Sequence, residues 1–186
     1  MELDRLIQER RSYRSLEQTE ISRDHIDELA KAAQLTLSCY NNQPWRYVFA
    51  HNEKTLENMH EALAKGNEWA KRASLIVAVA SKPDLDCQVK GREYYLFDTG
   101  MATAIMILKA TDMGLVAHPI AGFDEQKTKE ILSIPDEYTV ITLIIIGKKA
   151  DHVYEDLSEF QKETEMQRPE RKPLHEIARI NSFTGD

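Results

Sequence analysis

Glycine is scarce in this 186-residue sequence, and its seven glycines are widely separated. They never form a GxGxxG pattern or a P-loop, the two glycine-rich turns that commonly hold nucleotide phosphates. A nucleotide-like ligand would therefore need another way to hold its phosphate. The sequence also lacks a GxSxG elbow, so an α/β-hydrolase active site is not expected.

Cysteine is equally rare, with only Cys39 and Cys87. Two cysteines do not make a disulfide framework, and their spacing fits neither a CxxC pair nor a zinc site. We expect two free thiols in the reducing cytosol, and hence a cytoplasmic protein. The acidic start of the chain is not followed by the apolar core of a signal peptide. The six histidines are scattered and none belongs to an HExxH motif, so no metal site is expected.

Positive charge is in deficit, because 24 Lys and Arg residues face 31 Asp and Glu residues and the net charge is −7. Nucleic-acid binding needs a basic face, and peripheral membrane binding often relies on the same residues. Long hydrophobic runs are missing too, since the longest, Val140 to Ile146, is too short to span a bilayer. Neither nucleic acid nor membrane is therefore an expected partner.

What the sequence does contain is a core for one domain, because 42% of its residues are hydrophobic. Runs of apolar residues predict strands at 75–80, 115–117 and 139–146. The segment 46–50, which follows a proline, is predicted to be a further short strand. Capping residues and helical apolar spacing predict helices that begin near Leu3, Ser22, Asn52, Arg92 and Asp124. This order predicts a single α+β domain over residues 1–186, with three layers and a small mixed sheet surrounded by helices.

The end of the chain has a different character. Residues 148–173 are dense in Lys, Glu and Asp and poor in large apolar groups, so they could not build a core of their own. They form either a solvated arm or a segment that packs on another subunit. We interpret 148–186 as a C-terminal arm that packs on a partner subunit.

Four arginines lie within the first fourteen residues of this acidic chain. Arg10, Ser12 and Arg14 are close enough in sequence to converge where a helix ends. Guanidinium groups bind phosphate oxygens through paired N–H donors, and a serine hydroxyl adds a further bond. The alternative is that these cations only favour the negative end of a helix dipole.

A second segment, NNQPW at 41–45, places amide side chains beside a rigid turn and directly before a strand. Amides offer both donors and acceptors. They suit the edge of a heterocycle that alternates N–H and C=O groups, such as the pyrimidine ring of a flavin. The alternative is a loop of turn-forming residues that Trp45 anchors to the core.

A third segment, PIAGFD at 119–124, joins a short strand to a helix. Small residues there allow a ligand to approach the backbone closely, and backbone N–H groups can stabilise negative charge. The alternative is a plain connection in which Asp124 caps the next helix.

In this order the three segments resemble the nitroreductase family of flavin mononucleotide (FMN) enzymes. The RRSxR pattern stands at 10–14, SxxNxQPW at 38–45 and PIxGFD at 119–124. LSIP follows at 132–135, where the family often has LGIP. The resemblance covers nearly the whole chain. It implies an α+β fold and an intertwined homodimer with two flavins at the subunit interface.

The resemblance also implies roles for individual residues. Arginines near both ends of the chain would hold the ribityl phosphate, and residues of the loop before Trp45 would approach the flavin from the partner subunit. Asn67 would meet the pyrimidine edge, and the backbone of Ala121 and Gly122 would lie beside flavin N5. The implied cofactor-binding residues are Arg10, Arg11, Ser12, Arg14, Ser38, Cys39, Asn41, Gln43, Asn67, Pro119, Ile120, Ala121, Gly122, Arg168 and Arg171.

The implied reaction is hydride transfer from NADH or NADPH, through flavin N5, to a small acceptor such as a nitroaromatic or a quinone. No catalytic side chain is expected, because the cofactor carries the redox chemistry. Tyr40, Tyr94 and Tyr95 are candidates for lining the substrate pocket. Two alternatives stay open: a flavoprotein of this fold with another reaction (flavin reduction, dehydrogenation or dehalogenation), and a non-enzymatic flavin-binding or regulatory dimer. Leu37 and Cys39 depart from the family pattern and leave the substrate open.

Overall fold

The computed structural model describes residues 3–183, and its sheet is built around one long strand, β7 (Thr139–Lys149). Along one edge β7 pairs with β3 (Leu75–Ser81), which also pairs with β2 (Arg46–Ala50). Along the other edge β7 pairs with β6 (Val116–Ile120) and then with the short β1 (Leu16–Glu17). The α+β class is confirmed, but every described strand pair is antiparallel, so the expectation of a mixed sheet was wrong. β3 and β6 both run antiparallel to β7, which lies between them, so the strands that α4 connects run in the same direction but do not pair.

Side chains alternate along β3 between two hydrophobic clusters, one on each face of the sheet. Leu75 and Val77 belong to one cluster, and Ile76 and Ala78 to the other. All seven residues of β3 are buried, as the unbroken apolar run predicted. The sheet is therefore apolar on both faces and needs a helical layer on each.

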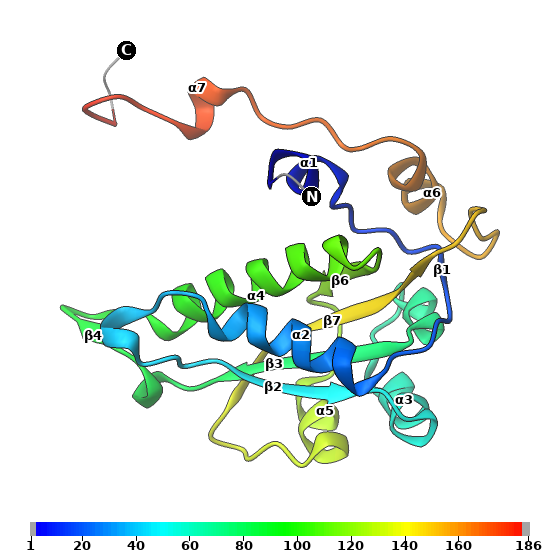
Figure 1. Ribbon diagram of the computed structural model, residues 1–186, viewed down its shortest axis with the longest axis horizontal. Helices are drawn as coiled ribbons and strands as arrows, with labels where there is room; N and C mark the ends of the chain where they lie inside the picture. The colour runs from blue at the N-terminus through cyan, green and yellow to red at the C-terminus, as the bar shows by residue number, and fades with distance from the viewer. Residues whose placement is uncertain (1–2, 184–186) are drawn as a thin grey trace.

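The three layers can be followed in Figure 1. The face with Leu75 and Val77 is covered by two packed helices, α2 (Arg23–Gln34) and α4 (Tyr95–Asp112). The opposite face is covered by shorter elements, which are α3 (Glu53–Met59), α5 (Glu125–Leu132) and the 3-10 turns η2 (His60–Ala62) and η3 (Glu68–Arg72).

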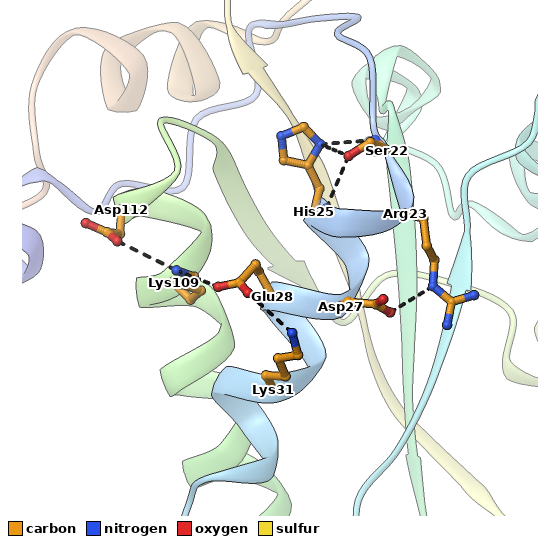
Figure 2. A network of polar contacts seen from close by, with 8 residues as sticks. All are labelled: Ser22, Arg23, His25, Asp27, Glu28, Lys31, Lys109 and Asp112. Atoms are coloured by element: carbon orange, nitrogen blue, oxygen red, sulfur yellow. Dashed lines mark hydrogen bonds and ion pairs between the residues drawn. The ribbon is translucent and has the colours of Figure 1, made fainter.

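Ser22 is the N-cap of α2, as predicted. The Ser22 hydroxyl accepts a hydrogen bond from the His25 N–H (3.3 Å), and His25 Nδ1 accepts one from the Ser22 N–H (3.0 Å). Figure 2 shows Lys109 of α4 reaching Glu28 of α2, with 3.2 Å between Nζ and the carboxylate. Such exposed ion pairs contribute little stability, so the apolar contact fixes this helix pair.

α4 begins at Tyr95, whereas the sequence predicted a helix from about Arg92. The residues before it form a hairpin of β4 (Gln88–Val89) and β5 (Arg92–Glu93). Its turn residues, Lys90 and Gly91, have φ angles of 52° and 78°, the left-handed backbone that two-residue hairpins use. Neither α4 nor any other described helix is both long enough and apolar enough to cross a membrane.

Cys39 and Cys87 form a disulfide, so the expectation of two free thiols was wrong. Cys39 begins the 3-10 turn η1 (Cys39–Asn41), just before β2, and Cys87 follows the turn η4 (Pro83–Leu85), just after β3. Because β2 and β3 are antiparallel neighbours, the start of one lies beside the end of the other. Their loops therefore meet although the cysteines are 48 residues apart in sequence.

The C-terminal segment packs on its own chain as far as α6 (Glu159–Met166), where Leu157 joins the core and Glu165 is buried. Beyond α6 the chain runs over α1 (Leu3–Glu9) and away from the body, through α7 (Leu174–Ile177) (Figure 1). Packing of this arm on a partner stays a prediction. Its exposed apolar side chains are Leu174, Ile177, Ile180 and Phe183.

Candidate functional site

Arginines from both ends of the chain line one cavity of about 220 Å³. α1 ends at Glu9, and the chain continues without regular structure through residues 10–15. In this stretch the Arg10 guanidinium donates a hydrogen bond to the Ser12 hydroxyl (3.2 Å). We call this the arginine cavity. Its polar lining consists of Arg10, Arg11, Ser12, Arg14, Thr164, Arg168 and Arg171.

α6 holds the N-terminal part of the cavity in place. The Glu165 carboxylate accepts hydrogen bonds from the N–H groups of Arg14 (2.7 Å) and Ser15 (3.0 Å). The Thr164 hydroxyl accepts one from the Arg14 guanidinium (3.0 Å). The sequence reasoning missed Thr164 and Glu165. The capping box that begins at Ser158 could have located their helix.

The arginine cavity holds more positive charge than nearby carboxylates neutralise. Among the described residues, the side chains of Arg10, Arg14 and Arg168 form no ion pair. Burial, followed by repulsion from Arg168 and Arg171, lowers the pKa of Arg10. Burial also lowers the pKa of Arg14, although Glu165 opposes this effect. A multiply charged anion would relieve the repulsion, and a phosphate matches paired guanidinium donors.

A second, apolar cavity of about 340 Å³ shares two of these residues, Arg10 and Ser12. α4 and β6 supply the rest of its lining. A ligand with an anionic end and an apolar body could therefore occupy both cavities. The residues from α4 and β6 are Ala104, Ile107, Leu108 and Pro119.

Asn67 and Gly122, both predicted to act near a flavin, contact each other. The Asn67 amide donates to the Gly122 carbonyl (2.9 Å), and the Trp69 indole N–H donates to Asn67 Oδ1 (3.2 Å). A Cβ at Gly122 would lie 2.6 Å from Asn67 Nδ2, so a larger residue would displace the amide. Pro119 and Ile120 are the last residues of β6 rather than part of the connection, and Ile120 is buried in the core.

His118 of β6 contacts the backbone of the N-terminal segment. Its ring packs on Trp69, with 4.7 Å between ring centroids, and its Nδ1 donates to the Tyr13 carbonyl (3.1 Å). Burial lowers the pKa of His118 to about 4, and the nearby charges of Arg14 and Arg10 add to this effect. His118 is therefore a neutral structural donor beside the cationic cavity at neutral pH.

The loop of residues 38–43 does not line the arginine cavity of its own chain. It lies next to β4, at the other end of the molecule from α6 (Figure 1). The Ser38 hydroxyl accepts a hydrogen bond from the Gln43 N–H (2.9 Å), and the Gln43 amide donates to the Asn41 carbonyl (3.1 Å). Tyr40, Asn41 and Gln43 have φ angles of 47°, 59° and 50°, so the loop is a strained but well-held unit.

The three tyrosines proposed for a substrate pocket differ in their surroundings. Tyr40 is 91% exposed, whereas Tyr95 is buried. Tyr94 is half-buried, and the edge of its ring meets Phe97 with 6.3 Å between centroids. None of the three lines either cavity, so within one chain they form no common pocket with the arginines.

The sequence model of the nitroreductase family matches residues 7–148, which is most of the chain. The chain belongs to the nitroreductase family. The predicted family is thereby confirmed, and with it the expectation of an oxidoreductase.

This nitroreductase-family chain is 26% identical, over 164 residues, to the oxygen-insensitive NADPH nitroreductase of Helicobacter acinonychis (strain Sheeba), covering 69% of this chain and 78% of the relative. The crystal structure of an oxidoreductase containing FMN is 29% identical and has a TM-score of 0.84, covering 100% of this chain and 95% of that one. A nitroreductase family protein from Clostridium novyi NT is 30% identical with a TM-score of 0.75, covering 81% and 87% of the two chains. The predicted nitroreductase-like α+β fold is confirmed.

Proposed function

We propose that this protein is an FMN-dependent oxidoreductase that uses NADH or NADPH to reduce a small acceptor, such as a nitroaromatic or a quinone. The observation that carries the proposal is the arginine cavity, whose clustered cations repel one another and fit a phosphate. When bound, FMN would supply the redox chemistry by accepting hydride at N5 and passing it to the acceptor. Similarity to an FMN-containing oxidoreductase and to an NADPH nitroreductase supports this cofactor and reductant.

The parts of the arginine cavity have distinct roles toward a phosphate. Arg10 and Ser12 are adjacent donors, with 3.2 Å between the guanidinium and the hydroxyl. The Thr164 hydroxyl accepts a hydrogen bond from one N–H of the Arg14 guanidinium and so orients the other N–H groups of that guanidinium. Arg168 donates to the carbonyls of Gln8 and Arg10, which ties the C-terminal segment to the end of α1. A phosphate would therefore be enclosed only when both ends of the chain are in place.

The apolar cavity would take the uncharged part of the cofactor, because it continues from Arg10 and Ser12 toward α4. Two residues after β6, the absence of a side chain at Gly122 leaves room for the Asn67 amide beside the backbone. Asn67 is held there by its bonds to Gly122 and Trp69, so it would present a fixed amide to a heterocycle edge.

We also infer a homodimer, because the 38–43 loop lies apart from the arginine cavity of its own chain. In a dimer, this loop of a second copy would complete the flavin site. The exposed side chains of Leu96 and Phe97 on α4, together with the exposed apolar side chains of the C-terminal arm, offer surface for that contact. Light scattering at working concentration tests the inference, and a monomer would contradict it.

Titration of apoprotein with FMN tests the cofactor site directly. Arg14→Ala should weaken binding roughly 10- to 150-fold, because one charge-assisted hydrogen bond contributes about 1.5–3 kcal/mol. Arg23→Ala is the matched control, since Arg23 is exposed, pairs with Asp27 and lies outside the cavity. Equal affinities for the two variants would remove Arg14 from the site, and a protein that gains no flavin absorbance would refute the function.

Anaerobic addition of NADH and then NADPH to the FMN-loaded protein tests the reductant. We expect the flavin absorbance to bleach with at least one of the two nucleotides, and to return when a nitroaromatic or quinone is added. A flavin that binds but is never bleached would instead favour the non-enzymatic flavin-binding protein.

A further inference from the structure

The disulfide and the side chains around it form a second chemical site, apart from the arginine cavity. We call Cys39, Cys87, Asn42, Asp86 and Asp98 the cysteine site. Both cysteines are half-buried, and neither belongs to a hydrophobic cluster of the core. The disulfide therefore lies outside the core, and attack by an external thiolate depends on access to one of its sulfurs.

Two carboxylates flank the disulfide. Asp98, which is 2% exposed, accepts a hydrogen bond from the Cys39 N–H (2.6 Å), and Asp86 Oδ1 accepts one from the Cys87 N–H (2.8 Å). Asp86 Oδ2 is buried and has no hydrogen-bond partner among the described residues. Burial, and then the nearby carboxylate of Asp86, raises the pKa of Asp98. Backbone N–H donors therefore hold both carboxyl groups beside the disulfide.

Asn42 distinguishes the two sulfurs. Its side-chain amide donates to Asp86 Oδ1 (3.2 Å) and to the sulfur of Cys87 (3.5 Å). Within residues 3–183 the sulfur of Cys39 receives no such bond. A donor stabilises negative charge on sulfur, so Cys87 is the better leaving group and Cys39 the better target.

We propose that Cys39–Cys87 is a redox-active disulfide that exchanges with dithiols while the protein stays folded. A thiolate of the dithiol attacks Sγ of Cys39, the S–S bond breaks, and the electron pair leaves on Sγ of Cys87. That sulfur takes a proton from solvent. The second thiol of the reductant then displaces Cys39, which takes a proton from solvent. Two electrons and two protons have passed to the cysteines, and the reductant has become a disulfide.

Hydrogen bonds also hold the loops of the cysteine site together, so opening the disulfide does not require unfolding. The Ser81 hydroxyl donates to the Pro44 carbonyl (2.9 Å), and Asp98 keeps its bond to the backbone of Cys39. Asn42 still bridges to Asp86. No step involves a flavin, so this exchange can be measured whether or not the protein binds FMN.

Thiol counting under native conditions tests the proposal. The purified protein would be equilibrated anaerobically in buffers of oxidised and reduced dithiothreitol, quenched with acid, alkylated with N-ethylmaleimide and weighed by mass spectrometry. We expect no label in the oxidised protein, and two labels per chain after reduction, with unchanged far-UV circular dichroism. Labelling that requires denaturant would show a purely structural disulfide and overturn the proposal. Thiols that never oxidise, or that are blocked by bound zinc, would also overturn it.

The direction of attack is tested with single variants. Cys39→Ser leaves Cys87 free, and this thiol, whose thiolate accepts the Asn42 bond, should react with an aromatic disulfide reagent at lower pH than the free Cys39 of Cys87→Ser does. Asn42→Ala should slow reduction of the native disulfide about fivefold, because the leaving sulfur loses one hydrogen bond. Asn58→Ala, at an exposed position of α3, is the control and should keep the wild-type rate. The same rate in Asn42→Ala and Asn58→Ala would overturn the assigned role of Asn42 and the leaving group with it.

Discussion

The arginine cavity and the cysteine site differ in charge and in how the chain builds them. The arginine cavity joins segments 151 residues apart, since Arg14 meets Glu165 across the length of the chain. The cysteine site joins two loops 48 residues apart at one end of the β2–β3 pair. The first collects guanidinium groups, and the second collects two carboxyl groups beside a disulfide.

This difference shows two ways in which charge can be left unbalanced inside a fold. The cations of the arginine cavity cannot lose their charge near neutral pH, so only an external anion can relieve their repulsion. The two carboxyl groups of the cysteine site are instead held by backbone N–H donors, and burial raises the pKa of Asp98. We therefore expect an anionic ligand in the arginine cavity, whereas we expect thiol–disulfide exchange at the cysteine site.

The largest expected effect is the loss of stability on replacing Glu165, which should leave the cysteine site unchanged. Glu165→Ala should reduce the free energy of unfolding by roughly 2–6 kcal/mol, because the N–H groups of half-buried Arg14 and buried Ser15 lose their acceptor at about 1–3 kcal/mol each. Urea denaturation measures the loss. Glu163→Ala, at an exposed position on the same helix, is the control and should change little. Labelling of the cysteines should be the same in both variants, and a change in it would break the separation of the two regions.

A second expected effect concerns pH, through His118 below the arginine cavity. The folded pKa of about 4 lies below the ordinary 6.5, so the unfolded chain binds the proton first as the pH falls. The stabilisation is complete above pH 6.5 and is lost as the pH falls toward 4, about 3 kcal/mol in all. His118→Gln keeps an amide donor and should flatten this slope in denaturation curves, whereas His175→Gln, at an exposed position, should not. An unchanged slope in His118→Gln would assign the effect to other groups.

A smaller effect is expected beside the cavity at Gly122. Gly122→Ala should lower stability by about 1–3 kcal/mol, because the new Cβ would push the Asn67 amide away from its partners. Gly100→Ala is the matched control, since a Cβ there meets nothing within 4 Å on α4 and should be neutral or stabilising. Thermal unfolding compares the two. Equal melting temperatures would mean that Asn67 moves without loss.

The smallest effect tests the ligand assignment without flavin. Inorganic phosphate at tenfold its dissociation constant should stabilise the apoprotein by about 1.4 kcal/mol, because it binds only the folded cavity. The gain should fall to about 0.4 kcal/mol or less in Arg14→Ala and persist in Arg23→Ala, which lies outside the arginine cavity. Melting curves at constant ionic strength measure it. An undiminished phosphate response in Arg14→Ala would contradict the assignment.

Local signals in the sequence predicted the elements that depend on nearby residues. The apolar runs of β3 and β7 and the caps at Ser22 and Asn52 were correct, because burial and capping act over a few residues. The family motifs led to the arginines of both ends of the chain, and the structure brings them to one cavity. Their role toward a cofactor stays a prediction.

Features that depend on the meeting of distant segments were missed. Thr164 and Glu165 carry no motif, and their importance follows only from the return of α6 onto residues 11–15. The second strand of the hairpin before α4, β5, was assigned to the helix, because helical spacing of apolar residues cannot show where the backbone turns.

The sequence by itself determined the family, the α+β class and the residues that could hold an anion, because each follows from patterns along the chain. Only the tertiary structure decided that Cys39 and Cys87 form a disulfide between two carboxyl groups. Antiparallel pairing of β2 and β3 creates that meeting, and strand register is set by the packing of the whole sheet rather than by either loop.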